Sequence, residues 1–269
     1  MNILITAGGT TEKIDNVRTI TNNSTGKLGA TIADTLASRA GFPVAKIYYV
    51  CGQNSATPRS NKAHITRVSS VNDLIQVLKN IMTTEKIDAV IHSMAVSDYT
   101  VDFLTTKSML ASSISSIVYQ QQQNRNTDPK VLSDQILEDA FSNIDTLISD
   151  SKVSSNIDDM VIVMKKTPKV IGLIKQLQPT TLLVGFKLLS NVSHEALIDT
   201  AYNLLIKNKC DLVLANDLAE ITGDNHIGYL VAADKSYETF ETKAGIAGGI
   251  VTRLNTLLTK TVSEERNRQ

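Results

Sequence analysis

Short apolar runs and amphipathic, helix-like segments alternate along most of this chain, and no other feature restricts its possible folds as strongly. The expected strands are Ile3–Thr6, Val44–Val50, His64–Val68, Asp88–Val96, Met160–Met164, Thr181–Phe186 and Asp211–Asp217. Helices are expected at 28–40, 167–177 and 246–258, and two further helices are expected to begin at Ser70 and Ser193. A hairpin within 229–242 is expected before the last helix. Strands that alternate with helices favour a parallel sheet, so the pattern predicts an α/β fold: a doubly wound, Rossmann-like, mostly parallel sheet that binds ligands at the carboxyl ends of its strands.

One polar stretch interrupts this alternation between Tyr99 and Ser151. It is rich in Ser, Gln, Asn and Thr, contains the run Gln120–Asn126, and has room for one helix near 129–147. A connection this long without clear strands is typical of a lid, an arm or a partly disordered segment, and the composition leaves all three open. We therefore expect a single domain over 1–258 with a polar insert at about 99–151, followed by a frayed tail at 259–269.

The composition narrows the range of partners and compartments. The 27 Lys and Arg residues equal the 27 Asp and Glu residues, so no basic field favours nucleic acid. Cys51 and Cys210 match no metal-binding spacing and are expected to be reduced core residues. Met1 leads into the first strand without a basic leader, and no apolar run approaches the roughly 18 residues of a membrane span. The expectation is a soluble, cytoplasmic protein that binds neither nucleic acid nor membrane.

Two turns of small residues lie within the first thirty positions. Ala7–Thr10 follows the first expected strand, and Asn22–Ala30 leads into the first expected helix. Backbone N–H groups converge in such turns and a helix N-terminus favours negative charge, so both can hold phosphate; the alternative interpretation is that they are only tight turns. Arg18 lies between them and carries a planar cation suited to phosphate or carboxylate. Neither turn matches the dinucleotide fingerprint GxGxxG or the P-loop.

Several charged residues near expected strand and helix ends are further candidates. The carboxylate of Asp98 can accept hydrogen bonds from a ligand or can form a turn. The ammonium group of Lys152 can neutralise the charge of a bound phosphate; the alternative interpretation is that Lys152 is only a solvent-exposed surface residue. Lys207 and Lys209 lie at a helix end, where the helix dipole alone would explain them. No histidine has the spacing of a catalytic triad or a metal site, and His92 is expected to be a hydrogen-bonded core residue.

Six motifs of the chain carry a resemblance to one family. The longest is Ile5–Gly29, with Asp15, Arg18 and Asn22 at its centre; the others are Ala95–Tyr99, Lys152–Ser155, Lys166–Ile171, Val184–Phe186 and Ala215–Leu218. Together they resemble the phosphopantothenoylcysteine synthetases, also called phosphopantothenate–cysteine ligases, of coenzyme A biosynthesis. The resemblance extends from Met1 to about Leu258 and looks like the stand-alone bacterial type.

The resemblance implies a ligation in two steps. The carboxylate of 4′-phosphopantothenate attacks the α-phosphate of CTP, which releases pyrophosphate and forms an acyl-cytidylate. The amine of L-cysteine then attacks the acyl carbon and displaces CMP. The family resemblance further implies Mg²⁺ bound with the CTP, and a homodimer whose active site is completed across the subunit interface. No metal ligand is assigned among the protein side chains.

The same resemblance assigns roles to individual residues. The implied catalytic residues are Asn22, Lys152 and Arg18. The implied substrate-binding residues are Arg18, Asn22, Ser24, Thr25, Gly26 and Asn216. The implied nucleotide-binding residues are Gly8, Gly9, Ala95, Asp98, Thr167, Pro168, Lys169, Val170, Phe186 and Lys207.

Two of these assignments have alternatives. Ser154 and Ser155 replace lysines that are common in the family's lysine segment, and the insert lengthens the spacing from Asp98 to Lys152. Lys107 is therefore the alternative catalytic lysine. Lys209 is the alternative to Lys207.

Two other functions compete with the ligase. An NAD(P)-dependent oxidoreductase on a Rossmann-type sheet would carry a glycine-rich fingerprint and a Tyr-x-x-x-Lys pair, and the residues four positions after Tyr99 and Tyr202 are Phe103 and Ile206. The other competitor is a catalytically inactive nucleotide-binding relative of the ligases.

Overall fold

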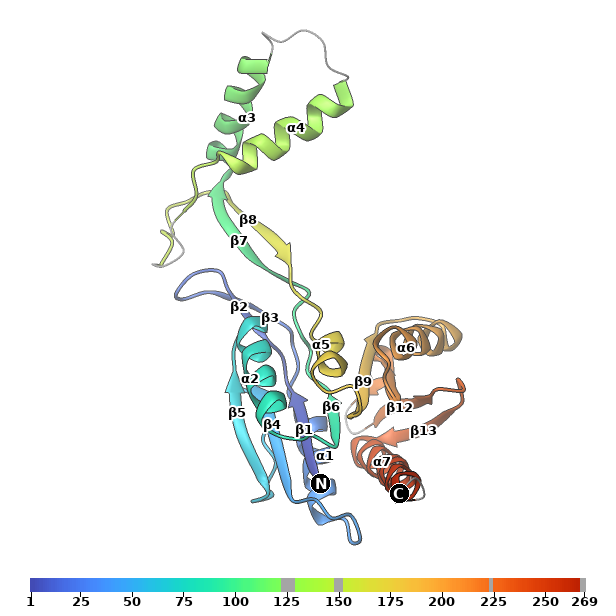
Figure 1. The fold of residues 1–269 in the computed structure, drawn as a ribbon. Helices are drawn as coiled ribbons and strands as arrows, with labels where there is room; N and C mark the ends of the chain where they lie inside the picture. Colours follow the sequence, from blue (N-terminus) through green and yellow to red (C-terminus); the bar gives the residue numbers. More distant parts are fainter. Residues whose placement is uncertain (122–128, 148–151, 223–224, 267–269) are drawn as a thin grey trace. The chain divides into compact units, whose positions relative to one another are not determined.

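A computed structural model gives the structure of this chain and describes residues 1–121, 129–147, 152–222 and 225–266. The chain forms two compact units (Figure 1). The sheet unit consists of Met1–Thr11, Thr21–Ser97 and Pro168–Gln269, and the hairpin unit consists of Glu12–Ile20 and Asp98–Thr167. The predicted single domain over 1–258 stays a prediction. No helix of the described residues is long and apolar enough to cross a membrane.

The described part of the sheet unit is built on a nine-stranded sheet in the order β11-β12-β10-β9-β6-β1-β4-β5, with β13 paired to β12. Its strands are β1 (Asn2–Ala7), β4 (Lys46–Gly52), β5 (Ala63–Val68), β6 (Ala89–His92), β9 (Leu182–Leu189), β10 (Leu212–Asp217), β11 (Ile221–Thr222), β12 (Asn225–Ala232) and β13 (Tyr237–Thr242). The pairs from β5 through β10 are parallel, and those of β12 with its neighbours are antiparallel. The predicted Rossmann-like, mostly parallel α/β sheet is confirmed.

Helices cover both faces of this sheet. They are α1 (Lys27–Ser38), α2 (Val71–Thr84), α5 (Val170–Leu177), α6 (His194–Asn208) and α7 (Lys243–Arg266). Successive side chains of a strand point to opposite faces, which divides the core into two clusters. One cluster combines Ile3 and Ile5 of β1 with α1 and α7, and the other combines Leu4 of β1 with α2, α5 and α6.

Local sequence signals fix several helix boundaries. Ser70 accepts a hydrogen bond from the Asp73 backbone N–H at 3.1 Å, and the Asp73 carboxylate accepts one from the Ser70 backbone N–H at 3.0 Å. This reciprocal capping box starts α2 as predicted. Ser193 caps α6 without the reciprocal bond: its side chain accepts a 3.2 Å bond from the Ala196 N–H.

The hairpin unit contains an antiparallel ribbon that carries two helices (Figure 1). The ribbon consists of β7 (Tyr99–Thr106) and β8 (Met160–Lys166), and the helices are α3 (Lys107–Gln121) and α4 (Pro129–Ser142). A second, two-stranded sheet, β2 (Thr11–Lys13) with β3 (Thr19–Thr21), lies along the turn that contains Arg18. Thr100 of β7 donates a 2.7 Å hydrogen bond to the buried Glu12 carboxylate, so the 12–20 segment is attached to the ribbon.

Several expectations for this part of the chain were wrong. The strand at Met160–Met164 does not belong to the large parallel sheet, because it pairs antiparallel with β7. The polar stretch after Tyr99 begins with a regular strand, whose partner β8 lies outside the stretch, and it contains two helices that pack against each other. Its helix near 129–147 ends at Ser142. Most of the glutamine-rich run, at 122–126, lies outside the described residues.

Other boundaries also differ from the sequence interpretation. The strand expected at Asp88–Val96 ends at His92, after which the chain leaves the sheet and Ala95 makes only an isolated bridge to Gly9. The helix expected from Thr167 begins at Val170, and β9 continues to Leu189 beyond Phe186. The closing helix extends to Arg266, so the segment expected to fray is helical through that residue.

Candidate functional site

The predicted strand ends meet at the point where the sheet changes direction. From β1 the chain proceeds through β4 and β5 on one side, and then returns through β6, β9 and β10 on the other. Such a switch point leaves a crevice at the carboxyl ends of the central strands, which here are β1 and β6. Gly9 of the first turn bridges to Ala95, and the Ala95 N–H donates to the Gly8 carbonyl at 2.8 Å.

The glycines of this region permit a close approach of backbone segments. Gly8 has φ of 78°, and a side chain at Gly8 would overlap Ser55. A side chain at Gly9 would overlap the Asn22 carbonyl, so the two small-residue turns touch only because Gly9 has no Cβ. The Asn22 side chain donates a 3.3 Å hydrogen bond to the Ala95 carbonyl. Gly8, Gly9, Ala95 and Asn22 are therefore one packed group at the switch point.

A cavity of about 250 Å³ opens beside this group, within the sheet unit. Six residues predicted from sequence line it: Ser24, Thr25, Gly26, Ala95, Phe186 and Asn216. Three lysines also line it, Lys27, Lys187 and Lys243, and the described residues of its lining include no Asp or Glu. The lining charge is thus positive, which suits an anionic ligand.

The N-terminus of α1 forms one wall of this cavity. Gly26 is the N-cap residue with φ of 70°, and no side chain caps the helix there. A side chain at Gly29, in the first turn, would overlap Ala7, so the helix start lies directly against the end of β1. Uncapped N–H groups and the helix dipole make this wall a favourable position for a phosphate or carboxylate, in agreement with the phosphate interpretation of the turn.

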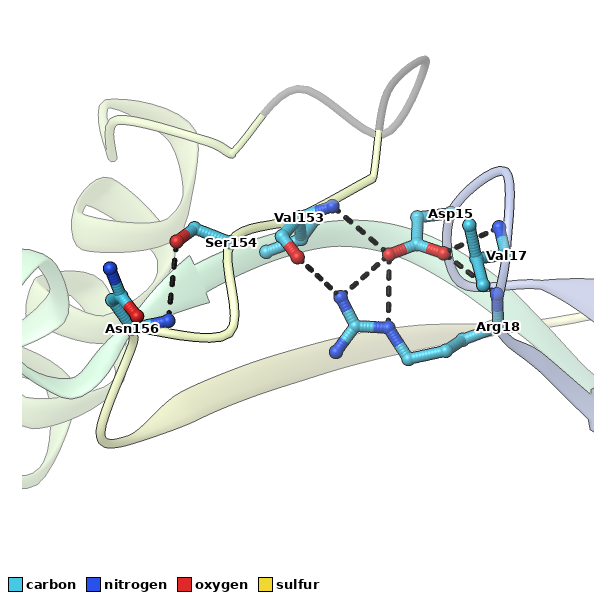
Figure 2. A network of polar contacts seen from close by, with 6 residues as sticks. All are labelled: Asp15, Val17, Arg18, Val153, Ser154 and Asn156. Carbon is cyan, nitrogen blue, oxygen red and sulfur yellow. Dashed lines mark hydrogen bonds and ion pairs between the residues drawn. The ribbon is translucent and has the colours of Figure 1, made fainter.

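A second cluster lies in the hairpin unit and centres on Asp15 (Figure 2). The Asp15 side chain, 2% exposed as a residue, accepts bonds from the Val17 and Arg18 backbone N–H groups at 2.8 and 2.7 Å. It also accepts bonds from Arg18 Nε at 3.0 Å, from Arg18 Nη2 at 2.7 Å and from the Val153 N–H at 3.1 Å. These donors, the Val17 N–H foremost, hold the pKa of the Asp15 carboxyl well below its usual range.

This cluster joins two predicted catalytic segments. Arg18 Nη2 donates a 2.8 Å hydrogen bond to the Val153 carbonyl (Figure 2). Val153 follows the exposed Lys152 in the chain. The Arg18 side chain is 40% exposed. Lys107, the alternative lysine, starts α3 and forms an exposed ion pair with Asp159 at 3.8 Å. Such exposed pairs contribute little to stability.

The remaining predicted nucleotide residues lie elsewhere. The Asp98 carbonyl accepts a 3.0 Å bond from the N–H of Thr167, at the base of the ribbon in the hairpin unit. In the sheet unit, Pro168 and Lys169 precede α5, and Val170 is buried in the core cluster that contains α6. Lys207 is exposed in the last turn of α6, whereas Lys209 is the left-handed C-cap residue. Val170 thus faces the opposite side of the sheet from Phe186, which packs with the α1–α7 cluster.

Three residues near these clusters were not singled out as candidates from the sequence. His226 on β12 and Lys243 at the start of α7 line the cavity, and Asp15 organises the hairpin cluster. Asp15 lies within the long family motif, and its spacing of three to Arg18 was a usable signal. His226 and Lys243 are more than 190 residues from the glycine turns in sequence, and no local pattern relates them to the cavity.

Two other sequence expectations are confirmed. Cys51 and Cys210 are free and buried. His92 is 6% exposed, and its Nδ1 shares a 2.7 Å hydrogen bond with Thr6 Oγ1. Burial lowers the His92 pKa to about 4.

Comparisons with known proteins give this geometry a context. The chain matches the profile of a family described as the DNA/pantothenate metabolism flavoprotein C-terminal domain, over residues 1–126 and 145–257. The coenzyme A biosynthesis bifunctional protein CoaBC of Thermococcus kodakarensis is 29% identical over 232 residues, which are 86% of this chain and 45% of that protein. The chain spans about half the length of the curated relatives it matches.

Solved structures share the fold. The DNA/pantothenate metabolism flavoprotein from Streptococcus pneumoniae is 33% identical with a TM-score of 0.74, and the match covers 96% of this chain and 99% of that one. A Cab2 variant in complex with phosphopantothenate-cysteine has a TM-score of 0.66 at 17% identity, with 98% of this chain and 88% of that chain covered. At that level of identity the second likeness concerns the fold alone.

Proposed function

This chain belongs to the DNA/pantothenate metabolism flavoprotein C-terminal domain family, and from this premise we propose that it joins 4′-phosphopantothenate to L-cysteine in coenzyme A biosynthesis. The product is 4′-phosphopantothenoyl-L-cysteine, and the proposed co-substrate is CTP. The observation that carries the proposal is the family match itself, because it spans both the cavity at the switch point and the Asp15 cluster.

The proposed reaction needs two successive substitutions. A carboxylate oxygen of 4′-phosphopantothenate forms a bond to the α-phosphorus of CTP, and the bond to pyrophosphate breaks. The cysteine nitrogen then forms a bond to the acyl carbon, CMP leaves with the electron pair of the broken C–O bond, and the nitrogen loses a proton. Both steps bring anions together, so the protein must supply positive charge and fix the geometry of the reactants.

The cavity of the sheet unit supports the binding of the acid substrate. Asn22 is fixed by its bond to the Ala95 carbonyl, and in the proposal it holds the carboxylate that reacts. Ser24, Thr25 and Gly26 offer hydroxyl and backbone donors at the start of α1, and Asn216 offers an amide from the end of β10. A rigid group of this kind limits the orientations of the bound acid.

Arg18 and Lys152 are the proposed catalytic cations. Two of the Arg18 side-chain nitrogens are committed to Asp15 and Val153, which fixes the plane of the guanidinium. Lys152 directly precedes Val153 in the chain and is exposed, so its ammonium group is accessible to an anion. In the proposal, both cations stabilise negative charge that develops on the phosphate oxygens.

Nucleotide recognition is the finer part of the proposal. The Asp98 carboxylate accepts a hydrogen bond from the cytosine amino group. Further contacts to the nucleotide come from Gly8, Gly9, Ala95, Thr167–Val170, Phe186 and Lys207. The described residues contain no cluster of three or more metal-binding side chains. In the proposal, Mg²⁺ binds the phosphates of the nucleotide, and no protein ligand is assigned to it.

We further propose a cytoplasmic homodimer in which each protomer contributes residues to the site of its partner. In the family resemblance this sharing concerns Asn22. Complementation between two different inactive variants tests this sharing.

The decisive experiment incubates the purified protein with 4′-phosphopantothenate, L-cysteine and CTP, and follows pyrophosphate and product by mass spectrometry. The ligase proposal expects pyrophosphate release that requires the acid, and amide formation that requires cysteine. The same assay with ATP determines nucleotide choice. Absence of pyrophosphate with either nucleotide would reject the ligase and leave the inactive relative as the better description.

Two lysine variants test the catalytic assignment within this assay. Lys152→Ala is expected to lose nearly all turnover, and the matched Lys107→Ala is expected to retain it, since Lys107 only pairs with Asp159 at the surface. The reverse result would transfer the role to Lys107.

A further inference from the structure

The cavity in the sheet unit has a wall to which no function has been assigned. His226, on β12, and Lys243, the first residue of α7, both line the cavity that the glycine turns and α1 enclose. His226 is 9% exposed, and among the described residues its Nδ1 has no hydrogen-bond partner. An unpaired buried nitrogen is costly unless a ligand satisfies it.

The charges around this histidine favour an anion. Burial and the nearby Lys243 cation both lower the His226 pKa, so the ring is held neutral with one N–H to donate. Lys243 lies at the N-terminus of α7, whose dipole adds to the positive potential. Lys27 and Lys187 line the same cavity, and in the part of the chain that the structure describes no acidic residue lines it.

The sheet order separates this wall from the reacting end of the cavity. His226 belongs to β12, which is three strand positions from β6, and Ala95 follows β6 beside Asn22. Three strand spacings are about 14 Å, so an elongated molecule with an anionic group at each end fits the arrangement. The acid of the proposed reaction has its carboxylate at one end and its phosphate at the other.

We propose that His226 and Lys243 form an anion subsite that binds the phosphate group of 4′-phosphopantothenate, opposite the carboxylate held by Asn22. This inference rests on the proposed function, and it explains how the site would distinguish 4′-phosphopantothenate from pantothenate. Lys243 supplies the charge and His226 supplies a directional N–H. The start of α1 contributes further donors on the facing wall.

The test compares the affinity of the protein for 4′-phosphopantothenate and for pantothenate by calorimetry. Lys243→Met and His226→Gln are expected to weaken binding of the phosphorylated acid by about tenfold or more, the usual effect of losing a charge-assisted hydrogen bond, and to leave pantothenate binding unchanged. Lys79→Met, at an exposed position of α2 on the other face of the sheet, is the control and should change neither. Equal weakening of both acids, or a loss confined to CTP binding, would overturn the subsite.

A second measurement needs no variant and so remains valid if one fails to fold. Inorganic phosphate is added to the native protein, and the ring nitrogens of His226 are followed by NMR. We expect a saturable shift of these signals, and their insensitivity to phosphate would contradict the proposal. A protein that shows the predicted selectivity but releases no pyrophosphate with any nucleotide keeps the subsite and loses the ligase function. A protein that binds neither acid loses both.

Discussion

Asp15 receives five hydrogen bonds on a single side chain, and this concentration makes it the residue on which the hairpin cluster depends (Figure 2). Its two oxygens order the turn that carries Arg18 and, at the same time, fix the backbone next to Lys152. A carboxylate suits this position because every neighbour is a donor. Asp15 touches no proposed substrate in this arrangement, so we regard it as a positioning residue.

Asp15→Asn is expected to reduce turnover in the ligase assay on the order of a hundredfold, since small displacements of catalytic groups have effects of that size. The amide nitrogen of Asn would face the Arg18 and Val153 donors, and the segment near Val153 would exchange its amide hydrogens faster. Hydrogen exchange by mass spectrometry measures this directly. Asp102→Asn, which removes an exposed ion pair with Lys165 in the same unit, is the control. Unchanged exchange near Val153 would argue against the positioning role.

His92 gives the molecule a dependence of stability on pH. The folded state holds this residue neutral with a pKa of about 4, whereas the unfolded chain binds a proton near pH 6.5. The unfolded state therefore binds more protons between these two values, and the free energy of unfolding falls as the pH decreases from about 6.5 to 4. The stabilisation is fully present above pH 6.5.

Urea unfolding at several pH values tests this expectation. The contribution of His92 is on the order of 3 kcal/mol over the full interval, from a difference of about 2.5 pKa units. His92→Asn keeps a hydrogen-bonding group near Thr6 without the titration, so its unfolding free energy should change less between pH 7 and pH 4. Parallel pH profiles for the two proteins would show that His92 does not cause the effect.

Among the secondary-structure elements, α7 packs against the β12–β13 hairpin with a close contact at Gly249. Gly249 lies in the interior of this helix, in its second turn, where glycine is ordinarily unfavourable. A Cβ at Gly249 would overlap the ring of Phe240 on β13, whereas a Cβ at the adjacent Gly248 would meet nothing within 4 Å. The absence of a side chain at Gly249 thus allows the β12–β13 hairpin to pack against α7.

These neighbouring glycines form a matched pair of substitutions. Gly248→Ala is expected to raise the free energy of unfolding by about 0.5 to 1 kcal/mol, because alanine is the better helix former and has space. Gly249→Ala is expected to lower it by about 1 to 3 kcal/mol, because the added methyl group displaces Phe240. Denaturant unfolding of both variants measures the difference. Stabilisation by both substitutions would mean that Phe240 moves away at little cost.

At the scale of the whole molecule, the proposed catalytic residues belong to two compact units. Asn22 is in the sheet unit, and Arg18 and Lys152 are in the hairpin unit. If the proposed homodimer shares its sites between protomers, two different inactive variants can complement each other. Symmetric dimers allow this because each protomer contributes the same residues to both sites.

Mixing Asn22→Ala with Lys152→Ala after reversible dissociation is expected to restore about a quarter of the wild-type turnover, since half of the dimers are mixed and each has one intact site. Light scattering establishes the oligomeric state of each preparation. The control is the mixture of Arg18→Ala with Lys152→Ala, which complement only if Arg18 and Lys152 act at different sites. If the mixture of Asn22→Ala and Lys152→Ala forms dimers but recovers no turnover, Asn22 and Lys152 act in the same site from the same protomer.

The sequence by itself determined the sheet architecture and the part of the cavity that the glycine turns and the strand ends form. The alternation of apolar and amphipathic segments predicted the parallel strands, and the caps at Ser70 and Ser193 were predicted because they depend on neighbours within four residues. The motif residues from Gly8 to Gly26 were identified for a similar reason, since a glycine turn followed by a helix is defined by residues that are close together in the sequence.

Tertiary structure alone decided the pairing of distant segments. β8 resembled a strand of the central sheet, yet it pairs with β7, and only the fold could reveal this because strand pairing depends on partners far along the chain. His226 and Lys243 enter the cavity for the same reason: β12 and α7 pack beside elements that precede them by some two hundred residues. An apolar pattern indicates which face of an element is buried, but the chemistry of a site depends on which elements share an edge.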